Sequence, residues 1–214
     1  MPTSYQDIIK QCQKEWNCDS LMTGAQAERG DKIPFSSPLM NYATYGGIPR
    51  NKITEFFGEP GAGKSTSAVD ICKQAYKVFK KEFDEKVADL RDKVSKGNKN
   101  LKVDLDDLLD RGPKKVLYID LEHSFDKSWS NTIGLRDDEI DVMQPPDVAA
   151  EEILQRVQTI VETGEIGLIV LDSIPSLTTK SELEKKYGER TVASLAGLMT
   201  VFCRTGEAKA EKIT

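Results

Sequence analysis

Short apolar runs alternate with longer amphipathic segments along most of this 214-residue chain. Two of the runs, residues 115–120 and 166–172, are almost wholly apolar and end in aspartate, and a shorter run covers 140–143. Another, residues 53–57, precedes a glycine-rich loop. Strands that are apolar throughout are typical of a parallel sheet covered on both faces. The pattern therefore predicts an α/β fold with a parallel sheet and helices on both of its faces.

Helical spacing of apolar residues fills the segments between these runs. It covers residues 5–16, 39–43 and 148–163, and its longest stretch begins at Ser65. In that stretch the apolar residues recur at intervals of four, four, three and four: Phe79, Phe83, Val87, Leu90 and Val94. A continuous helix to Val94 would be about 45 Å long at about 1.5 Å per residue.

Residues 80–115 form a predicted helical insertion. Residues 97–100 interrupt the long helix, a second amphipathic piece follows at 103–109, and Gly112-Pro113 closes it. The insertion holds 11 Lys/Arg and 9 Asp/Glu residues, so it is almost neutral. We interpret it as a solvated protrusion with one apolar seam, and the alternative is an arm that docks DNA or a partner.

Composition and charge limit the remaining possibilities. Residues 1–35 are predicted to be an N-terminal arm or cap, and residues 36–214 the core. No apolar run approaches the ~20 residues of a membrane-spanning helix, and the N-terminus lacks a signal pattern, so we expect a cytoplasmic protein. Four cysteines without C-x-x-C pairing argue against a zinc site. The net charge of -5 argues against a surface that coats nucleic acid indiscriminately, although a local basic site is compatible with it.

The loop after residues 53–57 carries the first candidate chemistry. The phosphate-binding pattern G-x-x-x-x-G-K-[ST] is matched by Gly58, Glu59, Pro60, Gly61, Ala62, Gly63, Lys64 and Ser65, and Thr66 follows. A strand, a glycine-rich loop and a helix form the context that such a loop needs. Backbone N–H groups and the helix N-terminus bind phosphates in these loops. Lys64 is then expected to reach the β- and γ-phosphates, and the Ser65 hydroxyl to bind Mg²⁺.

Acidic residues follow both apolar strands. Asp172 ends the run 168–171 in the Walker B pattern and is expected to hold Mg²⁺ through its water shell. Glu122 lies just past the other strand, where it suits a group that orients the water attacking the γ-phosphate. Asp120 suits this role less well because we expect it to be held in the sheet. His123, the only histidine, is more simply a structural residue.

Three segments resemble the RecA-type strand-exchange recombinases: residues 46–66, 118–126 and 168–178. The middle segment is the most specific, because P-loop proteins in general do not share it. The resemblance implies a RecA-like ATPase core that uses ATP and Mg²⁺, binds single-stranded DNA and self-associates as a filament or ring. It implies that Glu122 activates water, that Asp126 hydrogen-bonds the adenine and that Trp129 stacks on it. The alternative for Trp129 is a half-buried packing residue.

Residues 177–190 resemble the family's passage into its first DNA-binding loop. The resemblance makes four basic residues candidates for DNA contacts: Lys185, Lys186, Arg190 and Arg204. Gly197 departs from the pattern, since bacterial members often carry Arg there. The mixed charge of the segment makes a solvated loop the alternative.

In the family, a strand ending in Asn-Gln and a second DNA-binding loop come next, and neither is found before Thr214. By the resemblance that strand lies between the P-loop strand and the Walker B strand, so we expect a sheet incomplete at its C-terminal part. The expected function is an ATP-hydrolysing recombinase core that binds single-stranded DNA for homologous recombination and repair. The alternatives are a truncated, non-hydrolysing nucleotide-binding regulator and a helicase- or loader-type motor with the same core.

Overall fold

The computed structural model describes residues 4–16, 30–98, 100–184 and 194–212. It divides into two compact units, residues 1–31 and 32–214. The first unit contains helix α1 (Tyr5–Trp16), which confirms the helix predicted there. Within the described residues, no helix has the length and the apolar composition needed to cross a membrane.

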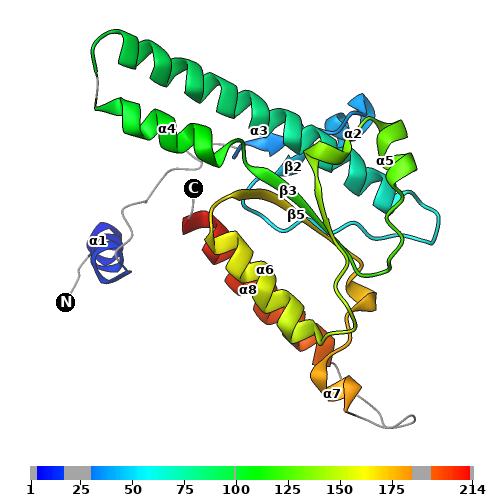
Figure 1. Cartoon of the computed structure of the whole chain (residues 1–214). Helices are drawn as coiled ribbons and strands as arrows, with labels where there is room; N and C mark the ends of the chain where they lie inside the picture. The colour runs from blue at the N-terminus through cyan, green and yellow to red at the C-terminus, as the bar shows by residue number, and fades with distance from the viewer. Residues whose placement is uncertain (1–3, 17–29, 99, 185–193, 213–214) are drawn as a thin grey trace. The chain divides into compact units, whose positions relative to one another are not determined.

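The second unit is built on a three-stranded parallel sheet (Figure 1). Strand β3 (Lys115–Asp120) is central, with β4 (Asp141–Met143) on one side and β5 (Ile166–Asp172) on the other. Asp120 is in register with Asp172, so β3 and β5 end at the same edge of the sheet. The predicted α/β fold is confirmed, and both long strands begin and end at the predicted residues.

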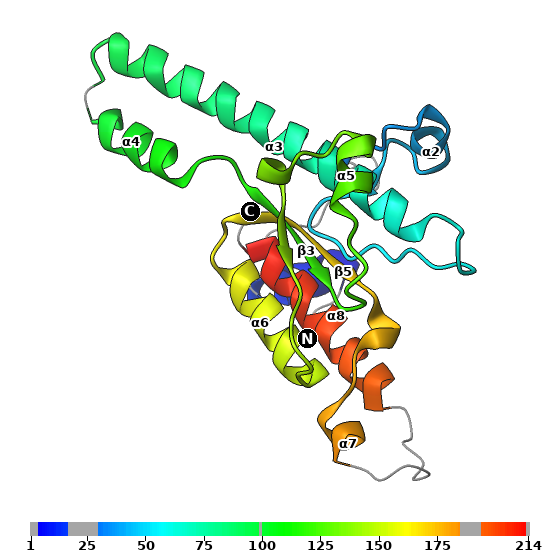
Figure 2. The same ribbon diagram turned by 45° about the vertical axis from the view of Figure 1, so that its right-hand side comes forward.

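Helices cover both faces of this sheet (Figure 2). Helix α3 (Lys64–Ser95) lies on one face, and the neighbouring helices α6 (Ala150–Glu162) and α8 (Ser194–Lys212) lie on the other. Alternate side chains of β3 supply the two layers: Val116 and Tyr118 join the core that α3 covers, whereas Leu117 and Ile119 pack with α6 and α8. A strand buried on both faces explains why its sequence is almost wholly apolar.

The fit between α3 and the sheet depends on one glycine. Phe79 of α3 is 2% exposed, and a Cβ atom added to Gly167 of β5 would lie 2.4 Å from its ring. Only glycine therefore lets the Phe79 ring lie this close to β5.

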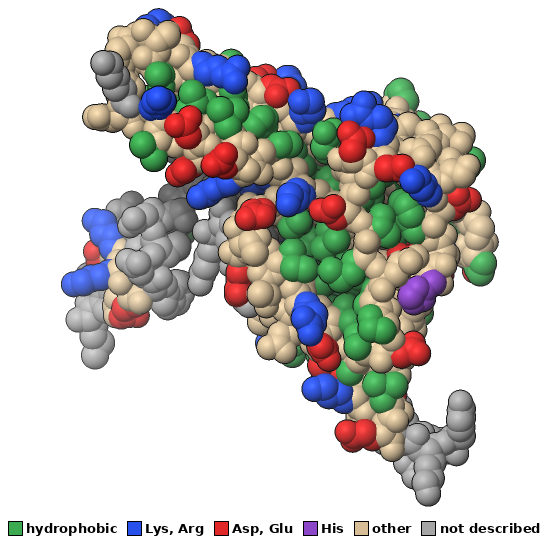
Figure 3. Space-filling model, in the orientation of Figure 1, with side chains coloured by type: hydrophobic (Ala, Val, Ile, Leu, Met, Phe, Trp, Pro, Cys, Tyr) green, Lys and Arg blue, Asp and Glu red, His purple; other side chains and the backbone are tan. Residues whose placement is uncertain are grey.

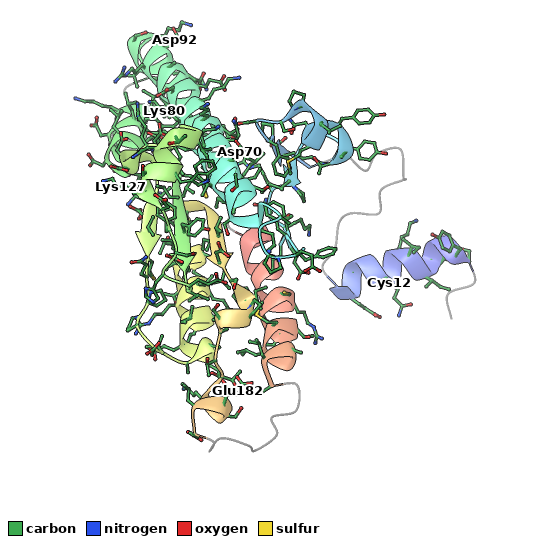
Figure 4. The ribbon with its side chains drawn as sticks, turned by 90° about the vertical axis from the view of Figure 1, so that its right-hand side faces the viewer. Cys12, Asp70, Lys80, Asp92, Lys127 and Glu182 are labelled. Atoms are coloured by element: carbon green, nitrogen blue, oxygen red, sulfur yellow. The ribbon has the colours of Figure 1, made fainter. Side chains whose placement is uncertain are left out.

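Beyond the sheet, α3 continues and helix α4 (Leu101–Arg111) packs back against it. Asp70, Lys80 and Asp92 follow one another along α3 (Figure 4). Lys80 and Asp92 each belong to one of the four exposed i,i+4 ion pairs along α3: Lys80–Asp84, Lys81–Glu85, Asp89–Lys93 and Asp92–Lys96. Basic and acidic side chains are interspersed over this hairpin (Figure 3). The helices predicted for this segment are observed, with the interruption between Ser95 and Leu101, whereas its interpretation as an insertion remains a prediction.

A small ribbon and helix precede the glycine-rich loop. Strand β1 (Lys32–Ile33) pairs antiparallel with β2 (Ile48–Pro49), and α2 (Pro38–Ala43) lies between them in sequence. Gly47 has a φ of 120°, and a Cβ there would lie 1.9 Å from the carbonyl oxygen of Ile33. The close approach of the two strands therefore requires glycine at this position.

The predicted strand over residues 53–57 is wrong, because no strand is assigned there. Phe57 is 87% exposed and Ile53 45% exposed. A strand needs a neighbour for its backbone hydrogen bonds, and among the described residues β5 pairs only with β3. Among the described residues, β5 is therefore an edge strand of this sheet.

Several short elements were not predicted, because each spans too few residues to show a period. They are helices α5 (Lys127–Ile133) and α7 (Lys180–Leu183) and the 3₁₀ turns η1 (Asp137–Glu139) and η2 (Ile174–Ser176). Helix α8 was also missed, although its apolar face contributes to the core beside α6. The charged segment after Gly206 continues this helix to Lys212.

Candidate nucleotide-binding site

The glycine-rich loop is exposed and leads directly into α3. Gly61 and Gly63 have φ angles of 78° and 85°, which residues with a Cβ atom rarely adopt. Gly63 caps the helix, and Lys64 and Ser65 are its first two residues. The loop therefore brings a helix N-terminus, with its free N–H groups and positive dipole end, to the surface.

Lys64 is folded back onto its own loop. Its Nζ atom donates hydrogen bonds to the backbone oxygens of Gly58 and Glu59, each at 3.0 Å. The N–H of Ala62 donates to the Glu59 oxygen at 3.2 Å and tightens the same turn. The lysine charge is thus held at the loop by carbonyl groups that a bound anion can replace.

Asp172 lies at the end of β5, where Tyr118 of β3 binds it. The Tyr118 hydroxyl donates to Asp172 Oδ2 at 2.6 Å. Tyr118 is 2% exposed, and burial together with this hydrogen bond raises the pKa of its phenol. The hydroxyl therefore remains protonated and acts as a permanent donor to the carboxylate.

Glu122 lies two residues past β3 and is exposed. Its Oε1 atom accepts hydrogen bonds from the hydroxyls of Ser173 and Ser176. The N–H of Leu121 donates to the backbone oxygen of Asp172 at 2.7 Å. Glu122 and Asp172 are therefore joined across the ends of β3 and β5, although they are 50 residues apart in the sequence.

Asp120 has a different environment and is fully buried. Its carboxylate accepts hydrogen bonds from the N–H groups of Ser124 and Phe125 and from Gln144 Nε2, at 3.1, 2.9 and 2.8 Å. Burial alone would raise the pKa of this carboxyl, but the hydrogen bond from Gln144 and those from the backbone outweigh it and lower the pKa. Asp120 thus holds the turn that carries Glu122, which agrees with its expected place in the sheet. Gln144 was missed because one glutamine after a short strand carries no signal.

Asp126 and Trp129 belong to the first turn of α5. Asp126 caps this helix, and its Oδ1 atom accepts a hydrogen bond from the N–H of Trp129 at 3.0 Å. The Trp129 side chain is 50% exposed. His123 is exposed and has a φ of 53°. The adenine contacts expected of Asp126 and Trp129 remain predictions.

Of the four predicted DNA-binding residues, the structure describes only Arg204. Lys185, Lys186 and Arg190 lie outside the described residues, whereas Arg204 is exposed on α8. Their role toward DNA remains a prediction.

The glycine-rich loop and the carboxyl ends of β3 and β5 lie on the same side of the sheet (Figure 1). This side holds a lysine, a serine hydroxyl at a helix N-terminus and two acids, each of which accepts a hydrogen bond from a hydroxyl group. Among the described residues, no group of three or more His, Cys, Asp or Glu side chains could hold a metal ion.

A family model for the RecA N-terminal domain matches residues 109–213. The protein RecA of Nautilia profundicola is 30% identical over 199 residues, which cover 92% of this chain and 47% of the relative. That of Thermus aquaticus is 27% identical over 204 residues, covering 94% and 49%, and that of Aquifex pyrophilus 29% over 175 residues, covering 81% and 40%. The chain is a divergent member of the RecA family.

The extent of these matches is informative. The model match begins near the end of the helical insertion, whereas an alignment over 94% of the chain also includes residues 58–65. The similarity to RecA proteins therefore extends over both halves of the chain. The chain spans 40 to 49% of the length of these relatives.

Proposed function

We propose that this chain is the ATP-binding and ATP-hydrolysing core of a RecA-type recombinase that acts on single-stranded DNA in homologous recombination and repair. The observation that carries the proposal is the pairing of Glu122 with Ser173, beside the Walker B aspartate, on the side of the sheet where the glycine-rich loop lies. The chemistry needs no covalent intermediate. It needs charge neutralisation, a held water and a fixed phosphate chain.

The loop residues supply the phosphate site. The N–H groups of residues 59–65 and the N-terminus of α3 bind phosphate oxygens. Lys64 exchanges the carbonyl oxygens of Gly58 and Glu59 for those of the β- and γ-phosphates. The exposed position of the loop allows this exchange without any change in the core.

The residues present fit a magnesium ion, because Mg²⁺ prefers hard oxygen ligands and few of them from the protein. Ser65 would hold it by its hydroxyl, and Asp172 through water. When bound, it neutralises charge on the phosphates. Asp172 keeps Oδ1 for this purpose, since among the described residues the side chain of Asp172 accepts its hydrogen bond, from Tyr118, on Oδ2.

Glu122 orients the attacking water and accepts its proton. Its Oε1 atom is held by the serine hydroxyls, so Oε2 is left for the water. Asp126 and Trp129, at the exposed start of α5, contact the adenine by hydrogen bonding and stacking. Lys185, Lys186, Arg190 and Arg204 bind DNA phosphates, and copies of the chain assemble on the DNA as a filament or ring.

The test is ATP hydrolysis with and without single-stranded DNA, beside Lys64→Ala and Glu122→Gln. Lys77→Ala is the matched control, because Lys77 is an exposed lysine of the same helix outside the loop. We expect stimulation by DNA that weakens with salt and is lost in both site variants but kept in the control. Nucleotide binding without turnover, even with DNA, would instead indicate the non-hydrolysing regulator.

A further inference from the structure

At the carboxyl ends of β3 and β5, each of the two acids accepts a hydrogen bond from a hydroxyl group of the neighbouring strand segment. Tyr118 of β3 donates to Asp172 at the end of β5, and Ser173, the next residue, donates to Glu122 beyond β3. The two strands thus exchange donors and acceptors at the point where both end. Asp172 is thus held by a residue of β3, and Glu122 by the residue that follows β5.

Of these donors, Tyr118 is the buried one. Its ring packs in the core cluster beside Cys72 and Leu135, and it meets the ring of Phe125 edge-on at 5.1 Å. A phenylalanine would fill the same volume without a polar atom to satisfy. A buried hydroxyl is costly unless it is hydrogen-bonded, and at this position the partner of the hydroxyl is Asp172.

We propose that Tyr118 is a positioning residue for the Asp172 carboxylate. Its hydroxyl holds Oδ2 at 2.6 Å and so fixes the rotamer of Asp172, which leaves Oδ1 for the hydration shell of a bound Mg²⁺. The inference rests on the proposed function, in which Asp172 supports the binding of a magnesium nucleotide. Tyr118 contacts neither nucleotide nor metal and acts only through Asp172.

The size of the effect follows from other metal sites. Partners that hydrogen-bond a metal ligand orient it in advance, and their loss costs about 10–100-fold in metal affinity. For a ligand that acts through water we expect the lower end. Without the Tyr118 hydroxyl, Asp172 must be ordered when Mg²⁺ binds, and this ordering reduces the apparent affinity.

The experiment compares Tyr118→Phe with Tyr76→Phe in the full chain. Tyr76 is a half-buried tyrosine of α3 packed against the same core cluster, so it controls for removal of a hydroxyl from this core. Binding of a fluorescent, non-hydrolysable ATP analogue is measured over a Mg²⁺ titration and in EDTA. We expect Tyr118→Phe to raise the half-saturating Mg²⁺ concentration about tenfold and to leave affinity in EDTA unchanged. Tyr76→Phe should change neither.

A double-mutant cycle with Asp172→Asn tests whether Tyr118 acts through Asp172. In the Asp172→Asn background, Tyr118→Phe should cause no further rise in the half-saturating Mg²⁺ concentration. The positioning role would be overturned if Tyr118→Phe left the half-saturating Mg²⁺ concentration unchanged. It would also be overturned if the variant lost equal affinity for the analogue with and without Mg²⁺. Failure of the unmodified chain to bind the analogue would overturn the proposed function itself, so the two failures are distinguishable.

Discussion

The glycine-rich loop and the carboxyl ends of β3 and β5, which serve one site in the proposed function, are built in opposite ways. The loop is exposed, and Lys64 is satisfied by carbonyl oxygens five and six residues away. The carboxyl ends of β3 and β5 are partly buried, and their hydrogen bonds join residues as far apart in the sequence as Tyr118 and Asp172. The loop can therefore rearrange around a ligand at little cost, whereas the edge holds its groups in place before any ligand arrives.

The largest effect should come from a substitution in the loop, and it should change ATP hydrolysis but not stability. Lys64→Ala should lower kcat/KM for ATP about 1,000-fold, because a charged donor to the phosphates is lost. The midpoint of urea unfolding should not move, since the lysine contacts only its own loop. Steady-state kinetics and urea titration of one preparation test both. A large loss of stability would remove the distinction between loop and edge.

At the edge, the largest effect should concern stability. Asp120→Asn should lower the free energy of unfolding by about 2 kcal/mol, because an amide group cannot accept all the hydrogen bonds that the buried carboxylate accepts. Asp126→Asn offers a matched control, since that carboxylate caps a helix at the surface and asparagine caps about equally well. Urea unfolding at pH 7 distinguishes the variants. Equal effects at both positions would show that burial does not set the cost.

The stability contribution of Asp120 should also depend on pH in a definite direction. Its pKa is lowered in the folded state, where hydrogen bonds from Gln144 and the backbone outweigh the opposing effect of burial. The contribution is therefore complete above the unfolded pKa, about 3.9, and is lost as the pH falls through the lower folded pKa. The difference in unfolding free energy between the natural chain and Asp120→Asn should shrink from pH 6 to pH 3. A constant difference would contradict this.

The smallest effect should come from the exposed segment before the loop. Phe57→Ser should change the free energy of unfolding by no more than about 0.5 kcal/mol, because the ring is 87% exposed. The buried counterpart, Phe79→Ala, should cost about 3–5 kcal/mol, since it leaves a cavity against β5. Thermal melts of the two variants test the contrast. A large loss in Phe57→Ser would show that residues 53–57 are packed in solution.

Local patterns predicted most of the longer elements that need no distant partner, although α8 was missed. The helices over residues 5–16 and 148–163 and the long helix from Lys64 follow from apolar spacing, because one helix satisfies its own backbone hydrogen bonds. The strands at 115–120 and 166–172 were predicted because burial on both faces leaves an apolar run. The strand at 53–57 was wrong for the complementary reason, since a strand exists only beside a partner and the described sheet provides none there.

From the sequence alone came the resemblance to the RecA family and the candidate loop and acids, because these depend on residue type and local spacing. The tertiary structure decided how the acids are held. The register of β3 and β5 places Asp120 beside Asp172. The folded chain also brings Tyr118 to Asp172 and Ser173 to Glu122, and in each pair the hydroxyl donates a hydrogen bond to the acid. Hydrogen bonds between residues 51 and 54 positions apart leave no periodic trace in a sequence, so only the folded chain shows them.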